Sequence, residues 1–175
     1  MDIGLLLLRL AAGGIIAAHG AQKLFGSFGG PGIEGFGKMI EKMGLRPGKA
    51  YATVAGGSEF GGGILLVLGL LTPFGAAAVT GVMVGAIVLV HLDNGFFNTG
   101  GGLEFPLLLG TTALAVAFTG PGSFSLDAAM DLGLSGPAWG LAAAALATIG
   151  SLAMLASRSP KVSAEEEVTS ERSAS

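Results

Sequence analysis

The sequence predicts an all-α integral membrane protein, a bundle of four core transmembrane helices followed by a fifth, C-terminal helix. Hydrophobic residues make up 51% of the 175 positions and charged residues only 12%, whereas soluble domains carry about 25% charged residues. The mean hydropathy is +0.72. Five apolar segments cover residues 3–24, 50–71, 74–92, 103–118 and 138–155. Each approaches the ~17–25 residues that a helix needs to cross the hydrocarbon core, where the backbone must satisfy its own hydrogen bonds.

The first segment is expected to stay in the protein as a helix. The apolar run is preceded by Asp2 and by no Lys or Arg, and no small-residue cleavage site follows the run. The pattern therefore differs from that of a cleaved signal peptide. Arg9 falls at about the second turn of this helix. We expect its long side chain to reach out to the membrane interface.

The first connection, residues 26–48, opens with a glycine-rich run and then becomes amphipathic. Its apolar residues recur at three-to-four spacing, at Ile33, Phe36, Ile40 and Met43. This spacing predicts a short helix lying in the interface, ended by Gly44 and Pro47. An ordinary solvated loop helix is the alternative. Glu34 and Lys38 are four positions apart in the orientation that favours an ion pair.

The later connections contain turn and capping residues. Thr72 and Pro73 leave room only for a tight turn, so the second and third helices are expected to form an antiparallel hairpin. In the fourth connection, residues 119–137, Ser125 is expected to cap a short helix over 126–132. Asp127 would then lie near the positive end of that helix.

The chain is expected to divide into three parts. Residues 1–131 form the membrane domain, residues 132–157 add a C-terminal transmembrane helix, and the polar residues 158–175 form a disordered tail. Two glycine pairs with four-residue spacing, Gly57/Gly61 and Gly81/Gly85, allow helix backbones to approach closely. We interpret them as packing sites within the chain, with homo-oligomer formation as the alternative.

The basic residues predict an orientation. With five spans, the first connection, the third connection and the tail share one side of the membrane. The Lys and Arg residues other than Arg9 fall on that side, which should therefore be cytoplasmic. The sequence has no basic stripe of the kind that binds nucleic acid.

Six polar residues are predicted to gather in the leaflet next to the first connection. His19, Gln22 and Lys23 end the first helix, Glu59 lies about nine residues into the second, His91 ends the third and Glu104 begins the fourth. Phe96, Phe97 and Phe105 should form an apolar rim beside them. An unpaired carboxylate at the depth of Glu59 would cost about 2.5–3.5 kcal/mol, so Lys23 and His19 are its natural partners.

Three interpretations of this cluster remain open. A Glu59–Lys23 ion pair could fix helix register, or the group could bind a polar ligand or relay protons. A haem held by His19 and His91 is a weaker hypothesis, because no HxxxH or ExxH spacing is present and a lone histidine is more often a packing residue. No metal site is predicted. The sequence contains no cysteine, so any redox chemistry would have to come from a partner or a bound cofactor.

Several motifs together resemble the DoxX family of bacterial membrane proteins. They are HGAQKLFG (19–26), FGGPGIEGF (28–36), GGSEFGGGILLVLGLLTP (56–73), HLDNGFFNTGGGLEFPLLL (91–109) and GPGSFSLD (120–127). The resemblance implies a compact bundle of four spanning helices in the bacterial inner membrane. It places His19, Gln22, Lys23, Glu59, His91 and Glu104 on the family's recurrent polar positions. Phe105 stands where members often have Tyr, and residues 138–155 extend beyond the usual four helices.

The resemblance also implies a function and partners. The family is named after a subunit of a thiosulfate:quinone oxidoreductase, and other members resemble membrane partners of superoxide dismutase and sulfurtransferase in oxidative stress. We therefore expect a membrane subunit of an oxidoreductase system that binds a quinone or small reductant and recruits a soluble partner. Glu59 would accept or relay a proton, Lys23 would hold an anionic or carbonyl oxygen, and His19 would donate a hydrogen bond. The alternatives are a ligand-free membrane scaffold and a small-molecule transporter.

Overall fold

A computed structural model describes residues 2–159 of the chain, and the prediction of a disordered tail lies outside the described residues from position 160 onward. The structure is built from helices α1 (Asp2–Phe25), α2 (Gly32–Lys42), α3 (Gly48–Leu68), α4 (Thr72–Ala86), α5 (Glu104–Thr119), α6 (Leu126–Ala129) and α7 (Pro137–Ala156). The described residues contain no strand. The predicted all-α fold is thereby confirmed.

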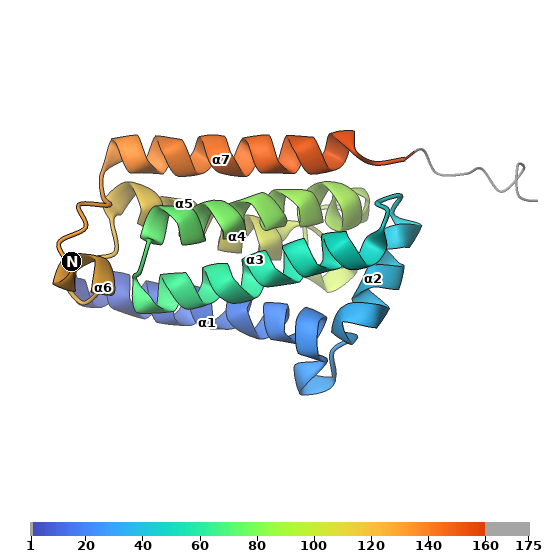
Figure 1. The fold of residues 1–175 in the computed structure, drawn as a ribbon, viewed down its shortest axis with the longest axis horizontal. Coiled ribbons are helices and arrows are strands. Elements are labelled where there is room, and N and C mark those ends of the chain that lie inside the picture. The colour runs from blue at the N-terminus through green and yellow to red at the C-terminus, as the bar shows by residue number, and fades with distance from the viewer. Residues whose placement is uncertain (1, 160–175) are drawn as a thin grey trace, which may run out of the picture.

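Helices α1, α3, α4 and α5 form an antiparallel bundle, and α7 packs on its outer side against α4 and α5 (Figure 1). Within the described residues, four helical stretches are long and apolar enough to cross a membrane, namely Asp2–Phe25, Gly48–Leu68, Thr72–Asn94 and Pro137–Ala156. The predicted C-terminal helix is therefore present at full length. Helix α5 is apolar but has only 16 residues.

Close helix approach depends on glycine, although partly at other positions than the predicted pairs. A Cβ atom on Gly63 would lie 2.6 Å from the backbone nitrogen of Ala17, and one on Gly20 would lie 2.3 Å from that of Phe60. These contacts bring α1 against α3. Gly81 and Gly85 face α7 as expected for packing within the chain, whereas the Cβ positions of Gly57 and Gly61 meet no atom of the described residues within 4 Å.

Helix α2 lies across one end of the bundle (Figure 1). Its apolar face is buried on the protein itself, because Phe36 and Ile40 pack with Leu45 and Ala52. Glu34 does not pair with Lys38 as predicted. It forms an exposed ion pair with Lys49 of α3, with 2.5 Å between Oε1 and Nζ, and this contact lowers the pKa of Glu34 below its usual value.

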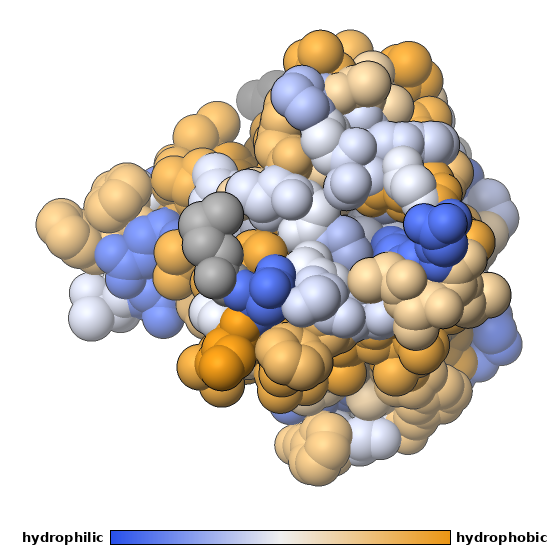
Figure 2. Space-filling view, turned by 90° about the vertical axis from the view of Figure 1, so that its left-hand side faces the viewer, coloured by the Kyte–Doolittle hydropathy of each residue, from blue (hydrophilic) through white to orange (hydrophobic). Residues whose placement is uncertain are grey.

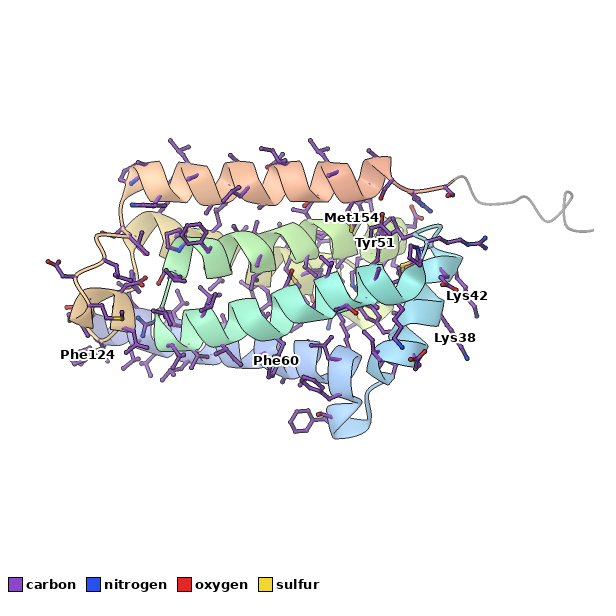
Figure 3. All side chains as sticks on the ribbon, viewed as in Figure 1. Lys38, Lys42, Tyr51, Phe60, Phe124 and Met154 are labelled. Carbon is purple, nitrogen blue, oxygen red and sulfur yellow. The ribbon has the colours of Figure 1, made fainter. Side chains whose placement is uncertain are left out.

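The same end carries most of the basic residues, and we call it the basic end. It is defined by Lys23, Lys38, Lys42, Arg46, Lys49 and Arg158; the side chains of Lys38 and Lys42 project outward from α2 (Figure 3). The C-terminal end of α7 is tied to it by three hydrogen bonds. Tyr51 Oη donates to Ser157 Oγ, Arg158 Nε donates to the Met43 carbonyl, and the Ser159 amide donates to the Gly44 carbonyl.

The other end, built around residues 120–136, is held by buried polar groups. Arg9 does not reach solvent as predicted. Its side chain is buried, and its guanidinium donates to the carbonyl oxygens of Pro121, at 2.5 Å, and Phe124, at 2.6 Å. The prediction that Arg9 reaches out to the membrane interface is therefore wrong, because the loop after α5 folds back over this side chain. Seen end-on, this face has mainly residues of intermediate hydropathy, with apolar residues around them (Figure 2).

Ser125 caps α6 as predicted, accepting a hydrogen bond from the amide of Ala128. The helix ends at Ala129, three residues earlier than expected. The buried Asp127 has a second role, since its carboxylate accepts hydrogen bonds from the amides of Leu71 and Thr72 at the start of α4. Asp127 thus satisfies amides that the helix itself leaves without a partner.

Candidate functional site

An ion pair between α1 and α3 lies inside the bundle near the basic end. Lys23 Nζ donates to Glu59 Oε1 at 2.5 Å, and Glu59 is 1% exposed. The helices can approach here because Gly20 and Gly56 present no side chain to the opposing helix. Lys23 also lies over the ring of Phe36, 5.0 Å from its centroid. The pair is thus enclosed by α1, α2 and α3.

Only half of the Glu59 carboxylate is used by this pair. Its second oxygen, Oε2, is buried and meets no hydrogen-bond partner among the described residues. Buried polar atoms in native proteins nearly always have a partner, and an exception calls for an explanation such as a bound group. Glu59 Oε2 is therefore the most informative atom of the site.

Glu59 opens onto a small cavity of about 100 Å³ at the centre of the bundle, which we call the polar pocket. It is lined by Ile16, His19, Lys23, Glu59, Met83, Ala86, His91, Phe105, Pro106 and Leu109. All four core helices contribute, with His91 coming from the extension of α4. The His19 ring packs edge-on against Phe105, with 5.8 Å between centroids.

His91 reaches the pocket from an irregular turn. Helix α4 continues as a π-helix over Ile87–His91 before a short 3-10 segment. Single π-turns inside helices are frequent at functional sites. The Nδ1 atom of His91 donates to the carbonyl of Gly101 at 2.6 Å, which holds the imidazole ring between this loop and the pocket.

The structure therefore brings together His19, Lys23, Glu59 and His91, and it leaves three other candidates outside the polar pocket. Gln22 lies beside Gly30 of the first connection, on another side of α1. Glu104 begins α5, and its amide donates to the carbonyl of Phe96. Phe97 is 70% exposed and packs on Phe96. Of the three rim phenylalanines, only Phe105 lines the pocket.

A second, larger cavity of about 730 Å³ adjoins the polar pocket and was not predicted from the sequence. We call it the lateral groove, because α3 and α7 form its walls and α4 its floor; at the basic end it is also lined by Phe36, Met39 and Ile40 of α2. His19, Lys23, Ala86 and His91 line both cavities. Ala78, Gly81 and Gly85 lie on one face of α4. Their spacing was the sequence signal that could have predicted the groove, because small side chains leave space beside a helix.

The site contains no obvious metal centre. No group of three or more His, Asp or Glu side chains that could hold a metal ion occurs between residues 2 and 159. His19 and His91 border the same pocket. The other polar side chains that line it are Lys23 and Glu59, which are paired with each other.

Apolar helices long enough to span a bilayer, arranged around a buried ion pair, define a multi-pass membrane protein with a polar pocket inside its helix bundle. The chain belongs to the DoxX family, whose sequence profile matches residues 4–92. That match includes α1 to α3 and most of the extended α4, and thus His19, Lys23, Glu59 and His91.

The chain is also similar to a named bacterial protein. The chain is 34% identical over 126 residues to a Bacillus subtilis (strain 168) protein named "Putative oxidoreductase CatD", an alignment that covers 72% of this chain and 86% of the relative. No solved structure matches the chain.

Proposed function

We propose that this protein is a membrane subunit of a redox system and that its polar pocket binds the head of a quinone or of a small reductant. The observation that carries the proposal is Glu59, which lines the pocket and whose buried oxygen Oε2 has no hydrogen-bond partner among the described residues. An ionisable residue kept inside a membrane bundle generally marks a site for substrate, ion or proton. The name of the Bacillus subtilis relative supports a redox role.

The pocket offers complementary groups to such a head. Glu59 Oε2 accepts a hydrogen bond or a proton from a hydroxyl of the ligand. Lys23 Nζ and a His19 ring nitrogen donate to a carbonyl oxygen of the head. Phe105 supplies an apolar wall opposite His19. A carbonyl-bearing and a hydroxyl-bearing form of one head can therefore occupy the same place.

Electrons must be exchanged with another molecule, because the chain has no cysteine thiol to carry them. We propose that a soluble redox enzyme binds at the basic end, beside the exposed side chains of Lys38 and Lys42. The resemblance to the family favours a superoxide dismutase or a sulfurtransferase as partner and a role in oxidative stress. The excess of Lys and Arg at this end supports a cytoplasmic location for it, and the family resemblance favours the bacterial inner membrane.

A scaffold without ligand is the second candidate, and a specific contact favours it. Lys23 joins Glu59 of α3 to Phe36 of α2, so the ion pair also holds three helices together. In that case the cluster would be a packing device, and α2 alone would serve as the docking surface.

Binding of 1,4-benzoquinone and 1,4-hydroquinone to the purified protein separates the two candidates. Glu59→Gln should weaken binding by about tenfold, equivalent to about 1.4 kcal/mol, while the protein remains inserted and helical. Glu34→Gln is the matched control, because it removes an exposed carboxylate far from the pocket. His19→Ala provides a second variant, since His19 lines the pocket and packs edge-on against Phe105. Unchanged affinity in both pocket variants, with a lowered melting temperature for Glu59→Gln, would establish the scaffold instead.

A further inference from the structure

The lateral groove is a long apolar surface that leads from the bilayer to the polar pocket. Its walls are formed by Tyr51, Val54 and Ala55 of α3 and by Leu146, Gly150 and Met154 of α7. Tyr51 and Met154, labelled in Figure 3, both pack against the apolar cluster of Phe36, Ile40, Leu45 and Ala52 at the basic end. Its volume of about 730 Å³ lies within the roughly 300–1,000 Å³ typical of ligand sites.

The groove is deep because α4 presents small residues along its floor. Ala77, Ala78, Gly81 and Ala86 line it, and they leave the space between α3 and α7 unfilled. Ser151 of α7 turns its hydroxyl to the carbonyl of Gly81 and so holds α7 at the edge of the floor. Helix α7, which lies outside the family match, therefore converts one face of the hairpin α3–α4 into a groove.

The groove and the polar pocket are continuous. His19, Lys23, Ala86 and His91 border both of them. At their junction the positive charge of Lys23 is neutralised by Glu59 at 2.5 Å. A cationic head would be repelled by the ammonium of Lys23, and an anionic head would be repelled by the carboxylate of Glu59. A neutral head with hydroxyl or carbonyl groups would be repelled by neither.

We propose that the lateral groove holds the hydrocarbon chain of a neutral, single-chain lipid whose hydroxyl- or carbonyl-bearing head lies in the polar pocket. This inference rests on the proposed function for the head and specifies the substrate class as membrane-dissolved, not water-soluble. The lipid enters sideways between α3 and α7. A head group that fits the polar pocket binds more tightly when it carries a hydrocarbon chain, because the hydrocarbon chain enters the preformed apolar lateral groove.

Two glycines provide a matched pair of variants. A Cβ atom on Gly150 or on Gly14 meets no atom of the described residues within 4 Å, and both positions lie inside long helices. Gly150 lines the groove and Gly14 does not. Gly150→Leu therefore fills the groove without disturbing the backbone, and Gly14→Leu makes the same chemical change on a surface away from it.

The test uses geranylgeraniol with a diazirine at the chain end, photolysed with the protein in phosphatidylcholine nanodiscs. Cross-links are expected on the groove residues of α3, α4 and α7. Gly150→Leu should reduce them about tenfold, an effect of about 1.4 kcal/mol, and Gly14→Leu should leave them unchanged. The corresponding geranylgeranyl phosphate should label the groove more weakly. Equal labelling by the phosphate, an unchanged yield in Gly150→Leu, or protein–protein cross-links between two copies at these residues would each overturn the inference.

The two proposals fail in different ways. If 1,4-hydroquinone binds in a Glu59-dependent manner while the chain probe labels no groove residue, the head site stands and the chain site is overturned. If the chain probe labels the groove and hydroquinone binding is indifferent to Glu59→Gln and His19→Ala, the groove holds a chain and the proposed function fails.

Discussion

Lys23 of α1 and Glu59 of α3 form an ion pair, 2.5 Å between Nζ and Oε1, that occupies only one oxygen of a buried carboxylate. Buried pairs are poor stabilisers relative to well-packed apolar residues, but a single partner left behind is costly. The pair is therefore expected to contribute to stability in a strongly non-additive way.

The first prediction concerns this non-additivity. Glu59→Leu alone should lower the free energy of unfolding in detergent by about 3 kcal/mol, because the ammonium of Lys23 loses its partner. Adding Lys23→Met should restore most of that loss and still abolish hydroquinone binding. The measurement is thermal unfolding of the two single variants and the double variant. Additive losses would contradict the prediction.

Arg9 gives a second prediction. Arg9→Leu removes two charge-assisted hydrogen bonds to the carbonyls of Pro121 and Phe124. We expect a loss of about 3 kcal/mol, since each such bond contributes about 1.5–3 kcal/mol. Arg9→Lys should rescue little, because one ammonium cannot reproduce the planar fork. Arg46→Leu is the control, because the Arg46 side chain is exposed, and it should change stability by less than about 1 kcal/mol. Equal effects of Arg9→Leu and Arg46→Leu would contradict the structure.

The glycine contacts between α1 and α3 give a third prediction. Gly63→Ala places a methyl group 2.6 Å from the backbone nitrogen of Ala17, and overpacking of this kind costs about 1–3 kcal/mol. Gly57→Ala adds the same group in open space and should be neutral or stabilising by up to about 1 kcal/mol. Melting temperatures of the two variants in one detergent provide the comparison. A more stable Gly63→Ala protein would be inconsistent with the described helix contact.

The Glu34–Lys49 ion pair gives a pH-dependent prediction. The pKa of Glu34 is lowered by Lys49, so the pair stabilises the folded protein above the ordinary glutamate pKa of about 4.3. This contribution is lost as the pH falls through the lowered pKa. Wild type and Glu34→Gln should therefore differ in melting temperature at about pH 7 and converge at about pH 3. The difference should also shrink in high salt, because the pair is exposed. A melting-temperature difference between wild type and Glu34→Gln that grows as the pH falls would contradict the prediction.

The helices and their order follow directly from the sequence, since apolar length and turn residues are local signals. Thr72 and Pro73 do begin α4, and Ser125 does cap α6. The amphipathic spacing from Ile33 to Met43 correctly predicted α2. It could not reveal that Phe36 and Ile40 pack on α3, because the same spacing suits a lipid interface.

Within the polar cluster, topology placed the candidate residues in one leaflet but could not give their directions around each helix. His19, Lys23, Glu59 and His91 meet at one pocket, whereas Gln22, one residue away from Lys23, faces the first connection. The π-turn before His91 alters the direction of that side chain, and no sequence signal indicates such a turn.

Arg9 shows the same limit at the other end. Its partners are backbone carbonyls 112 and 115 positions away in the chain, and any residue type could supply them. Asp127 likewise was expected to serve its own short helix, but it reaches the amides of α4. Contacts between a side chain and a distant backbone leave no pattern in the amino-acid sequence.

Arg158 and Ser159 are hydrogen-bonded to Met43 and Gly44, so the chain leaves α7 directly beside the first connection. A reporter fused to the C-terminus thereby reads the compartment of α2 and of the whole basic end. In a bacterial host, a green fluorescent protein fusion should be bright and an alkaline phosphatase fusion inactive if that compartment is the cytoplasm. A dark green fluorescent protein fusion and an active alkaline phosphatase fusion would show the opposite orientation. Any soluble redox partner that binds the basic end would then be a periplasmic protein.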